Sequence, residues 1–349
     1  MDHELLEFDR VAKIQAINEQ YDLENNAYIS FSGGKDSMVL HTLIDLALPN
    51  NKIPRVYFNT GIEYKFMREF VKELAKKDSR IVIYNSGVNI KQMLETYGYP
   101  FKSKQHAHNW DVFKNNPRLT YIYISQIESN PELLKDYDFI HNLPRGIKTN
   151  IKYLYGVHEK KGGLYKAINS ISCPVKLRFQ FVPEYNGVKL SDKCCYKLKK
   201  EVAHRWENEN NRHIAITGIR ADEGGMRGLN GCTIFDGNSL TKFHPLKVCS
   251  DEWESWFIKK YKIQLCKLYY PPYNFDRTGC KGCPFALRIQ EELDVMKELL
   301  PNEYKQCEIL WKPVYDEYRR LGYRLKKRPK VNWEKIYEII GVKKGGAGK

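Results

Sequence analysis

Apolar and polar residues alternate with two periodicities along the first part of the chain, one typical of helices and one typical of strands. Apolar positions recur at helical spacing over residues 4–26, and a short apolar strand leads into a second helical pattern over residues 28–44. The pattern then predicts a strand at residues 53–58, a helix at 66–77 and a strand at 80–85. Strands and helices that alternate at this spacing form right-handed βαβ units. We therefore expect a doubly wound α/β fold with a mostly parallel sheet covered on both faces.

The periodicity weakens between about residues 97 and 190, which indicates a large insertion. Helical patterns return near the end of the chain, at residues 290–300 and 303–323. We expect residues 1–265 to form the α/β domain, interrupted by this insertion, and residues 266–349 to form a C-terminal helical region.

Composition narrows the class of protein. The formal net charge is +15 and the isoelectric point is near 9.2. Such an excess of positive charge favours polyanionic partners, nucleic acid before membrane, although a lysine-rich, solvated surface is the alternative. No apolar run approaches the ~20 residues that a membrane span needs, and the acidic N-terminus is unlike a signal peptide. We expect a cytoplasmic protein that does not contact a membrane.

Aromatic and basic residues are interleaved within the insertion, at residues 98–106, 152–155 and 176–179. Aromatic rings can stack on bases while the cations neutralise phosphates, so nucleic acid, either DNA or tRNA, would bind here. The alternative is an insertion whose tyrosines are half-buried and whose lysines are solvated.

A glycine-rich turn joins the first strand to the following helix. It contains the residues Ser32, Gly33, Gly34, Lys35, Asp36 and Ser37. Glycines let backbone N–H groups approach an anion closely, and the start of a helix adds unpaired donors. The serine hydroxyls and the lysine would add further contacts, which suits a di- or triphosphate or a sulfate. The spacing differs from the Walker pattern, in which a second glycine follows the first after four residues.

This turn resembles the PP-loop of the ATP pyrophosphatase superfamily, and its context is similar to the phosphoadenylylsulfate (PAPS) reductase branch. The resemblance implies an adenine nucleotide alpha hydrolase-like fold, with nucleotide binding by the residues of the turn. It also implies that Asn59, Thr60 and Gly61 face the adenine, with asparagine at a position where many members of the family have aspartate.

A strand at residues 213–218 ends in Gly218 and is followed by Arg220 and Arg227. Each guanidinium can clamp two oxygens of an anion, which lysine cannot do. The segment resembles the family's Gly-x-Arg-x-x-Glu-Ser-x-x-Arg loop at the nucleotide site, with Gly224 where serine is usual. The alternative is two surface arginines on a glycine-rich loop.

Four of the nine cysteines form two pairs, Cys194-Cys195 and Cys280-x-x-Cys283. Zinc, an iron-sulfur cluster and unmetallated thiols are all compatible with a Cys-x-x-Cys turn. Adjacent cysteines point apart and reach a single Zn²⁺ ion awkwardly, whereas a cubane accepts a thiolate on each of two irons. This favours a [4Fe-4S] cluster, as does the resemblance to the Cys-Cys and Cys-x-x-Cys set of iron-sulfur adenylylsulfate reductases and their non-reductase relatives.

The family's reductases attack sulfur with a thiolate in a C-terminal Glu-Cys-Gly-Ile/Leu-His segment, which has no counterpart after Cys283. Cys307, the one later cysteine, falls in a helical pattern without glycine and is a poor nucleophile candidate. The resemblance therefore favours an ATP pyrophosphatase that adenylates its substrate, as in iron-sulfur enzymes of DNA phosphorothioation and tRNA thiolation. An adenylylsulfate or PAPS reductase and a non-catalytic nucleotide sensor are the alternatives.

In this hypothesis the turn binds the leaving pyrophosphate of ATP, and Lys35 is one of the residues that bind it. Arg220 or Arg227 offsets charge on the phosphoryl oxygens, and Mg²⁺ bridges those oxygens with Asp36 as the nearest carboxylate. A nucleic acid is the favoured acceptor and a cysteine desulfurase the expected source of sulfur.

Overall fold

The computed structural model describes residues 2–160, 163–166, 172–220 and 231–326. Within these residues, six strands form one sheet in the order β3-β2-β1-β6-β8-β7. The strands are β1 (Ala27–Ser30), β2 (Arg55–Asn59), β3 (Ile81–Asn85), β6 (Ile214–Ile216), β7 (Thr233–Asp236) and β8 (Ser239–Phe243). All neighbouring strands are parallel except β7 and β8, which confirms the expected mostly parallel sheet.

Strand β1 lies at the point where the sheet changes its direction of growth. The chain proceeds from β1 outward to β2 and β3, and then crosses back to place β6 on the other side of β1. Ile29 of β1 therefore pairs with Arg55 of β2 on one side and with Ile216 of β6 on the other. In open α/β sheets, ligands bind beyond the carboxyl end of strands at such a switch point.

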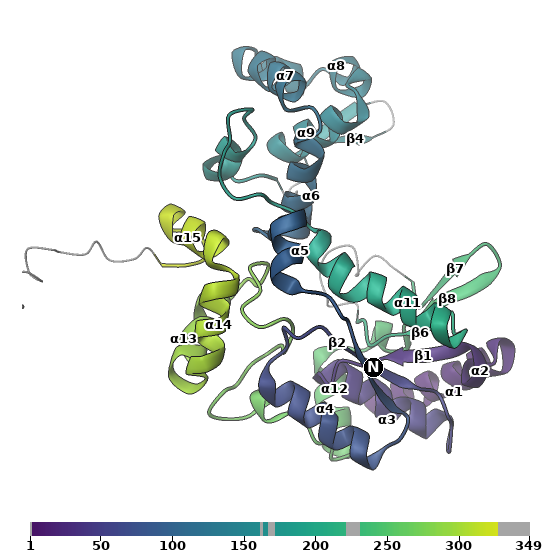
Figure 1. The fold of residues 1–349 in the computed structure, drawn as a ribbon. Helices are drawn as coiled ribbons and strands as arrows, with labels where there is room; N and C mark the ends of the chain where they lie inside the picture. Colours follow the sequence, from purple (N-terminus) through teal and green to yellow (C-terminus); the bar gives the residue numbers. More distant parts are fainter. Residues whose placement is uncertain (1, 161–162, 167–171, 221–230, 327–349) are drawn as a thin grey trace, which may run out of the picture.

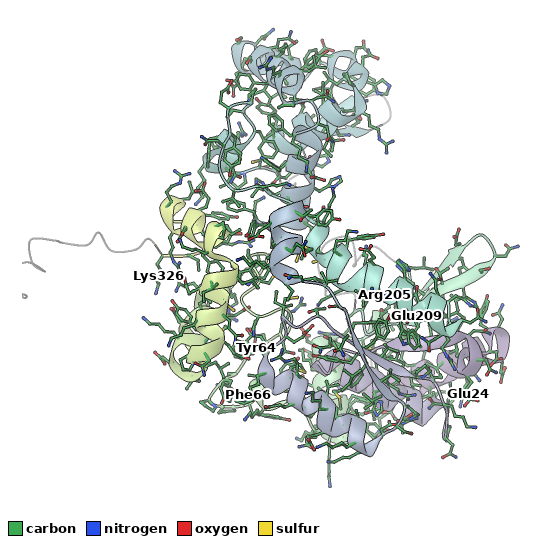
Figure 2. The ribbon with its side chains drawn as sticks, viewed as in Figure 1. Glu24, Tyr64, Phe66, Arg205, Glu209 and Lys326 are labelled. Atoms are coloured by element: carbon green, nitrogen blue, oxygen red, sulfur yellow. The ribbon has the colours of Figure 1, made fainter. Side chains whose placement is uncertain are left out.

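Helices cover both faces of the sheet, as expected. One face carries α1 (His3–Tyr21), α3 (Lys35–Ala47), α4 (Lys65–Lys77) and α12 (Asp251–Lys260), which gather on the same side of it (Figure 1). The other face carries α11 (Glu201–Asn210), whose Trp206 packs against Tyr28 with ring centroids 4.9 Å apart. Arg205 and Glu209 of α11 (Figure 2) both form hydrogen bonds with the hydroxyl of Tyr84 on β3. These polar contacts fix α11 along the edge of the sheet.

The segment between β3 and β6 is mostly helical. It contains α5 (Ile90–Tyr97), α6 (Lys104–Phe113), α7 (Pro117–Ser129), α8 (Tyr137–Asn142) and α9 (Arg145–Tyr155), with the hairpin β4 (Val157–Lys160) and β5 (Gly163–Lys166). Helices α6 to α9 and strand β4 form a lobe that projects away from the sheet (Figure 1). The fully buried His106 ties this lobe together, because its ring nitrogens lie 2.8 Å from the Tyr153 hydroxyl and 2.8 Å from Gln180 Oε1.

Three helices, α13 (Ile289–Leu299), α14 (Pro301–Leu310) and α15 (Lys312–Leu321), end the described chain. The single helical pattern expected over residues 303–323 is wrong, since the chain breaks at Trp311 between α14 and α15. Pro313 explains the break, because it has no N–H group for the preceding turn and its ring clashes with that turn's carbonyl. No helix in the described part of the chain is both long and apolar enough to cross a membrane.

Candidate functional site

The glycine-rich turn follows β1 at the switch point of the sheet. Gly33 has a backbone φ of +71°, and a β-carbon built on it would lie 2.6 Å from Val71 Cγ2 and 2.8 Å from Met67 Sδ. Both the left-handed backbone and the contact with α4 therefore require glycine at this position. Gly34 then takes the N-cap position of α3, and no side chain caps the helix there.

Side-chain hydroxyls shape the inside of the turn. The Ser32 hydroxyl lies 3.1 Å from that of Ser37 and accepts a hydrogen bond from the Gly34 N–H at 3.2 Å. The Lys35 N–H donates to the Tyr269 hydroxyl at 3.2 Å, and Tyr269 in turn lies 2.7 Å from Thr278 Oγ1. Both of these N–H groups are thus paired with protein hydroxyls, which an anion bound at the start of the helix would have to replace.

These groups line a cavity of about 460 Å³ beyond the carboxyl end of β1. Its walls come from five separate parts of the chain: the turn, the end of β2 with Glu63 after it, the end of β6, the start of α11 with the residues before it, and the segment before the Cys-x-x-Cys pair. The polar and charged residues that line it include Ser32, Lys35, Asp36, Ser37, Glu63, Lys199, Lys200, Thr217, Tyr269, Asp276, Arg277 and Thr278. The cavity falls in the ~300–1,000 Å³ range typical of small-molecule sites.

The loop after β6 approaches the turn closely. A β-carbon on Gly218 would lie 3.0 Å from the carbonyl oxygen of Asp36, so the close packing of this loop on α3 favours glycine. Gly218 lines the cavity, and Arg220 follows it with only 3% of its surface exposed. The second arginine predicted for this site, Arg227, lies outside the described residues, as does Gly224.

Two cations and three carboxylates form an ion network beneath the turn. Arg220 Nε donates to Asp36 Oδ1 at 2.7 Å, and Arg220 Nη2 donates to Asp251 Oδ1 at 2.5 Å. Lys35 Nζ lies 3.1 Å from Glu254 Oε2, so this ammonium is paired with α12. Arg220 therefore joins the loop after β6 to both α3 and α12.

The network carries one more negative charge than positive when all its groups are ionised. Glu254 is the most buried of the three carboxylates, with 1% of its surface exposed. Burial raises the pKa of Glu254 to about 7, the negative charge of Asp36 adds to this rise, and the two cations oppose it. Asp251 is more exposed, and its hydrogen bond from Arg220 lowers its pKa.

The residues predicted to face an adenine lie at the end of β2, beside the cavity. Asn59 donates a hydrogen bond to Asn85 Oδ1 at 2.7 Å, and Thr60 Oγ1 donates to Glu63 Oε1 at 2.6 Å. Neither Asn59, Thr60 nor Gly61 lines the cavity, although Glu63 does. The structure thus brings the turn, Gly218 and Arg220 together and leaves these three residues at one side.

The two cysteine pairs meet although 84 residues separate Cys195 from Cys280 in the sequence. Cys194 interacts electrostatically with Cys195, Cys280 and Cys283, and burial raises the pKa of the Cys194, Cys280 and Cys283 thiols. Cys194 and Cys195 form the short helix α10 (Lys193–Cys195), and a bridge between the Cys280 and Glu63 backbones docks the second pair on the end of β2.

The four thiols are not arranged around a single metal ion in the described part of the chain. Among the described residues, no three His, Cys, Asp or Glu side chains converge closely enough to hold a single metal ion. Tetrahedral zinc needs sulfurs about 2.3 Å from one centre. A four-iron cubane takes each thiolate on a different iron, so the electrostatic interaction of Cys194 with the other three thiols is the observation from which a cluster can be proposed.

Lys199 connects the cysteines to the cavity. It lines the cavity wall, and the negative charge of Cys280, followed by that of Glu63, raises its pKa. Lys199 belongs to a π-helical turn, Tyr196–Lys200, that directly follows Cys195. The cavity and the cysteine cluster therefore share a wall.

Comparison with known proteins identifies the family. A model of the phosphoadenosine phosphosulfate reductase domain matches residues 26–141 and 110–286, which is more than half of the chain. The chain belongs to this family. The matched ranges include the turn, Arg220 and all four paired cysteines, and the expected relationship to PAPS reductases is confirmed.

Individual relatives are distant. An uncharacterized protein of Methanocaldococcus jannaschii is 33% identical over 103 residues, which is 27% of this chain and 25% of that protein. The match thus spans about a quarter of that relative's length. The crystal structure of PAPS reductase from Candida auris, in a phosphate complex, is 13% identical with a TM-score of 0.38, covering 76% of this chain and 87% of that one.

Several residues of this family member's site were not found from the sequence. Lys199 follows the cysteine pair by four positions, and Tyr269 and Thr278 precede the second pair, but no local pattern marks them as part of the turn. Asp251 and Glu254 stand three residues apart at the start of α12, a spacing that places both on one helix face. That spacing is the signal by which they could have been found.

Proposed function

We propose that this chain is an ATP pyrophosphatase that adenylates an acceptor in the cavity beside the glycine-rich turn. One observation carries the proposal. The N–H groups and hydroxyls at the start of α3 border the same cavity as Lys199, Lys200 and Arg277. A ligand with several phosphates would meet both helix donors and cations in this cavity.

In the proposed reaction, an acceptor oxygen forms a bond to the α-phosphorus of ATP. The bond from that phosphorus to the α-β bridging oxygen breaks, and its electron pair leaves with pyrophosphate. The residues Ser32–Ser37 would hold the pyrophosphate, and Lys200 and Arg277 would offset charge on the phosphoryl oxygens. Because Arg220 is paired with Asp36 and Asp251, its role here is to position Asp36.

Two further groups follow from the family resemblance. Mg²⁺ would bridge the phosphates, with Asp36 as the nearest carboxylate although its Oδ1 already accepts from Arg220. A [4Fe-4S] cluster would be held by Cys194, Cys195, Cys280 and Cys283. It would add a charged group behind Lys199 and so influence the electrostatics of the cavity wall.

A nucleic acid is the acceptor that the charge of the chain favours. The net charge of +15 supports a polyanionic acceptor, as in DNA phosphorothioation or tRNA thiolation. The sulfur would come from a cysteine desulfurase as a persulfide, whose outer sulfur displaces AMP. A thiol reductant would then cleave the resulting S–S bond and leave the sulfur on the acceptor. The proposed outcome is sulfur incorporation into DNA or tRNA.

A sulfonucleotide reductase is the second candidate, because the matching family model describes a PAPS reductase domain. Such a reaction needs an accessible thiolate. Cys307 lies on α14 with 1% of its surface exposed, and burial raises its pKa to about 12. A reductase would therefore need a thiol from a partner protein. A nucleotide sensor would bind ATP at the same cavity without cleaving it.

Product analysis separates these three functions. The anaerobically purified chain would be incubated with Mg²⁺, radiolabelled ATP and either tRNA or DNA, and AMP and pyrophosphate would be measured. We expect nucleic-acid-dependent release of both. We expect Lys35→Ala to lower the rate by about 100-fold, whereas Lys72→Ala, which removes an exposed lysine of α4, keeps it.

Two results would contradict the proposal. ATP binding without pyrophosphate release, with every nucleic acid tried, would favour the sensor. Release of sulfite from adenylylsulfate or PAPS, in the presence of a reducing partner and without cleavage of ATP, would favour the reductase.

A further inference from the structure

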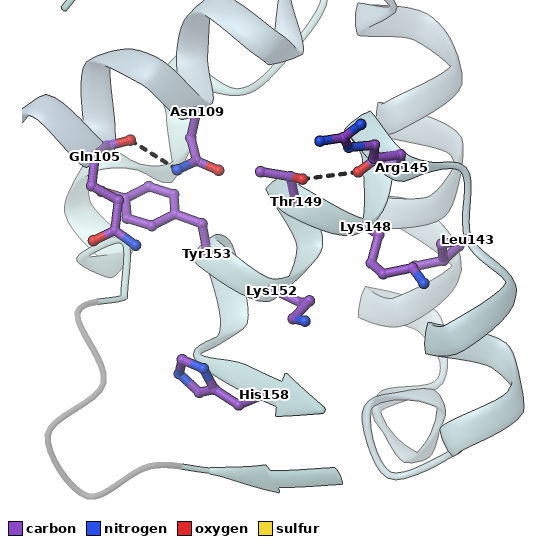
Figure 3. Close-up of a pocket in the computed structure, with 9 residues that line it drawn as sticks. All are labelled: Gln105, Asn109, Leu143, Arg145, Lys148, Thr149, Lys152, Tyr153 and His158. Carbon is purple, nitrogen blue, oxygen red and sulfur yellow. Dashed lines mark hydrogen bonds between the residues drawn. The ribbon is translucent and has the colours of Figure 1, made fainter. Parts of the chain in front are cut away.

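The helical lobe contains a second cavity, which shares no lining residue with the cavity beside the turn. It has a volume of about 470 Å³ and lies between α6, α9 and β4 (Figure 3). Its lining residues are Gln105, Asn109, Leu143, Arg145, Lys148, Thr149, Lys152, Tyr153 and His158.

One face of α9 makes the cavity basic. Arg145, Lys148 and Lys152 recur at positions i, i+3 and i+7 of the helix, so their side chains share this face. Glu159 of β4 lies 2.9 Å from Lys152 Nζ and 3.6 Å from Lys148 Nζ, so it neutralises one of the three charges. Within the described residues Arg145 has no ion-pair partner, and its side chain is exposed. The wall therefore keeps two positive charges in excess.

Asn109 of α6 supplies an unsatisfied acceptor on the opposite wall. Only 3% of its surface is exposed, and its Nδ2 donates to the Gln105 carbonyl oxygen at 2.8 Å. Its Oδ1 has no hydrogen-bond partner within the described chain. Figure 3 shows this oxygen directed into the space between α6 and α9. Buried polar atoms are nearly always paired in native proteins, so this oxygen points to a ligand that donates a hydrogen bond.

We propose that this cavity binds one nucleotide, either free or as an unstacked unit of a nucleic acid strand. The phosphate would be held by Arg145, Lys148 and Lys152, since a guanidinium and two ammonium groups on one helix face match the charge of a phosphate. An N–H group of the base or a hydroxyl of the sugar would donate to Asn109 Oδ1. An inorganic anion would satisfy the cations alone, and the volume leaves room for a nucleoside.

This site lies apart from the turn, and the proposal does not rest on the reaction proposed there. Two of the segments in which aromatic and basic residues alternate in the sequence contribute to it, through Gln105 on one side and through Lys152 and Tyr153 on the other. Tyr153 lines the cavity although it is almost fully buried, and its hydroxyl accepts a hydrogen bond from Lys102 Nζ at 3.1 Å.

Binding measurements on the full chain test the proposal. The probes are uridine monophosphate and a short, fluorescently labelled oligouridylate, which lack the adenine expected at the turn. The double variant Arg145→Ala with Lys148→Ala removes two cations of the cavity. Its matched control, Arg118→Ala with Lys135→Ala, removes two exposed cations elsewhere on the same lobe. Acetylation of individual lysines, followed by mass spectrometry, localises the contact.

We expect the cavity variant to bind the oligouridylate at least about tenfold more weakly, and the control to change affinity by less than about twofold. Bound oligouridylate should slow acetylation of Lys148 and Lys152 but not of Lys135. If uridine monophosphate also protects these lysines, the ligand is a free nucleotide, and if the strand alone does so, it is a nucleic acid.

Equal losses of oligouridylate affinity in the two double variants would overturn the proposal. So would unchanged acetylation of Lys148 and Lys152 in the presence of either probe. Cleavage of ATP is scored separately. If the unaltered chain cleaves ATP but binds neither uridylate probe, this second site alone is refuted. If it binds the probes at the cavity but does not cleave ATP, only the reaction proposed at the turn is refuted.

Discussion

Arg220 Nε donates a hydrogen bond to Asp36 Oδ1 at 2.7 Å, across 184 residues of sequence. The same guanidinium reaches Asp251 on α12, so one side chain joins the loop after β6 to two helices. Because Arg220 is 3% exposed, its charge depends on these carboxylates for compensation. Arg220 thus links the glycine-rich turn to α12, alongside the direct ion pair between Lys35 and Glu254.

Replacing Arg220 with alanine should destabilise the fold strongly. The variant leaves Glu254 and Asp36 near each other without the intervening cation, and removal of one partner of a buried pair costs about 3–5 kcal/mol. The unfolding free energy of Arg220→Lys should lie between those of Arg220→Ala and the wild type, since one ammonium cannot contact both Asp36 and Asp251. Urea denaturation measures the free energy of unfolding, and Arg118→Ala, on the exposed side of α7, is the control. An Arg220→Ala chain as stable as the control would contradict this role.

The ion network should also make stability depend on pH. Burial raises the pKa of Glu254 from 4.5 to about 7, so the folded chain binds this proton more tightly than the unfolded chain. The resulting stabilisation is fully present below pH 4.5 and is lost as the pH rises through about 7. The shift corresponds to about 3 kcal/mol at most. Lys35, Arg220, Asp36 and Asp251 are the charged groups that face Glu254 in the network.

Denaturation at a series of pH values compares the wild type with Glu254→Gln. The difference in unfolding free energy, wild type minus variant, should fall as the pH rises from 4.5 to 8, because glutamine does not titrate. Glu252→Gln changes an exposed carboxylate of the same helix and should leave the profile of the wild type unchanged. Parallel profiles for the wild type and Glu254→Gln would show that Glu254 does not take up the proton.

Local patterns in the sequence predicted the sheet and the turn because their physical causes are local. The strand, the glycine pair and the helix follow one another directly at residues 28–44, and the structure places a strand, a turn and a helix there. The break between α14 and α15 also has a local cause, Pro313, which the helical periodicity on both sides obscured. Local signals thus account for most of the fold.

The composition of the cavity wall could not be predicted in the same way. Tyr269 reaches the Lys35 N–H across 234 residues, and only the folded chain brings the two together. The acidic first turn of α12 was visible in the sequence, where it is typical of helix capping. In the structure Ser250 caps that helix, while Asp251 contacts Arg220. From the sequence, Asp251 is compatible with capping the helix or with an ion pair, and only the position of Arg220 in the folded chain distinguishes the two.

The two glycines of the turn should respond differently to substitution. In Gly33→Ala, the added methyl meets Val71 and Met67 at less than 3 Å and the backbone has a positive φ, so we expect a loss of about 1–3 kcal/mol in stability. In Gly34→Ala, the φ of −73° suits any residue and the methyl lies 3.2 Å from Ser32 Oγ. We expect near-normal stability with weaker ATP binding, because the methyl enters the anion site.

Thermal denaturation and nucleotide titration check this contrast between the two glycines. Gly237→Ala is a useful control, since it also has a positive φ but meets no atom within 4 Å, so it isolates the backbone cost from the steric one. If Gly33→Ala were no less stable than Gly237→Ala, the packing of the turn on α4 would not constrain its shape.

The cysteine cluster should hold iron when the chain is purified without oxygen. A [4Fe-4S] cluster predicts about four irons and four sulfides per chain and a brown protein. Cys280→Ser should lose most of the iron, because Cys280 is one of the four thiols proposed to hold the cluster and interacts electrostatically with Cys194 and Cys195. Cys232→Ser changes a half-buried thiol that contacts the His244 carbonyl oxygen in another part of the fold, and it should keep the iron.

The metal analysis is extended by two further measurements: the identity of the bound metal, and the iron content and ATP affinity of Lys199→Ala. Zinc in place of iron would contradict the proposed cluster, because the same thiols would then hold a single tetrahedral ion. Lys199→Ala should retain the iron and lower ATP affinity, because Lys199 lies in the cavity wall and supplies no ligand atom. Loss of iron in that variant would mean that Lys199 supports the cluster itself, through its contact with Cys280.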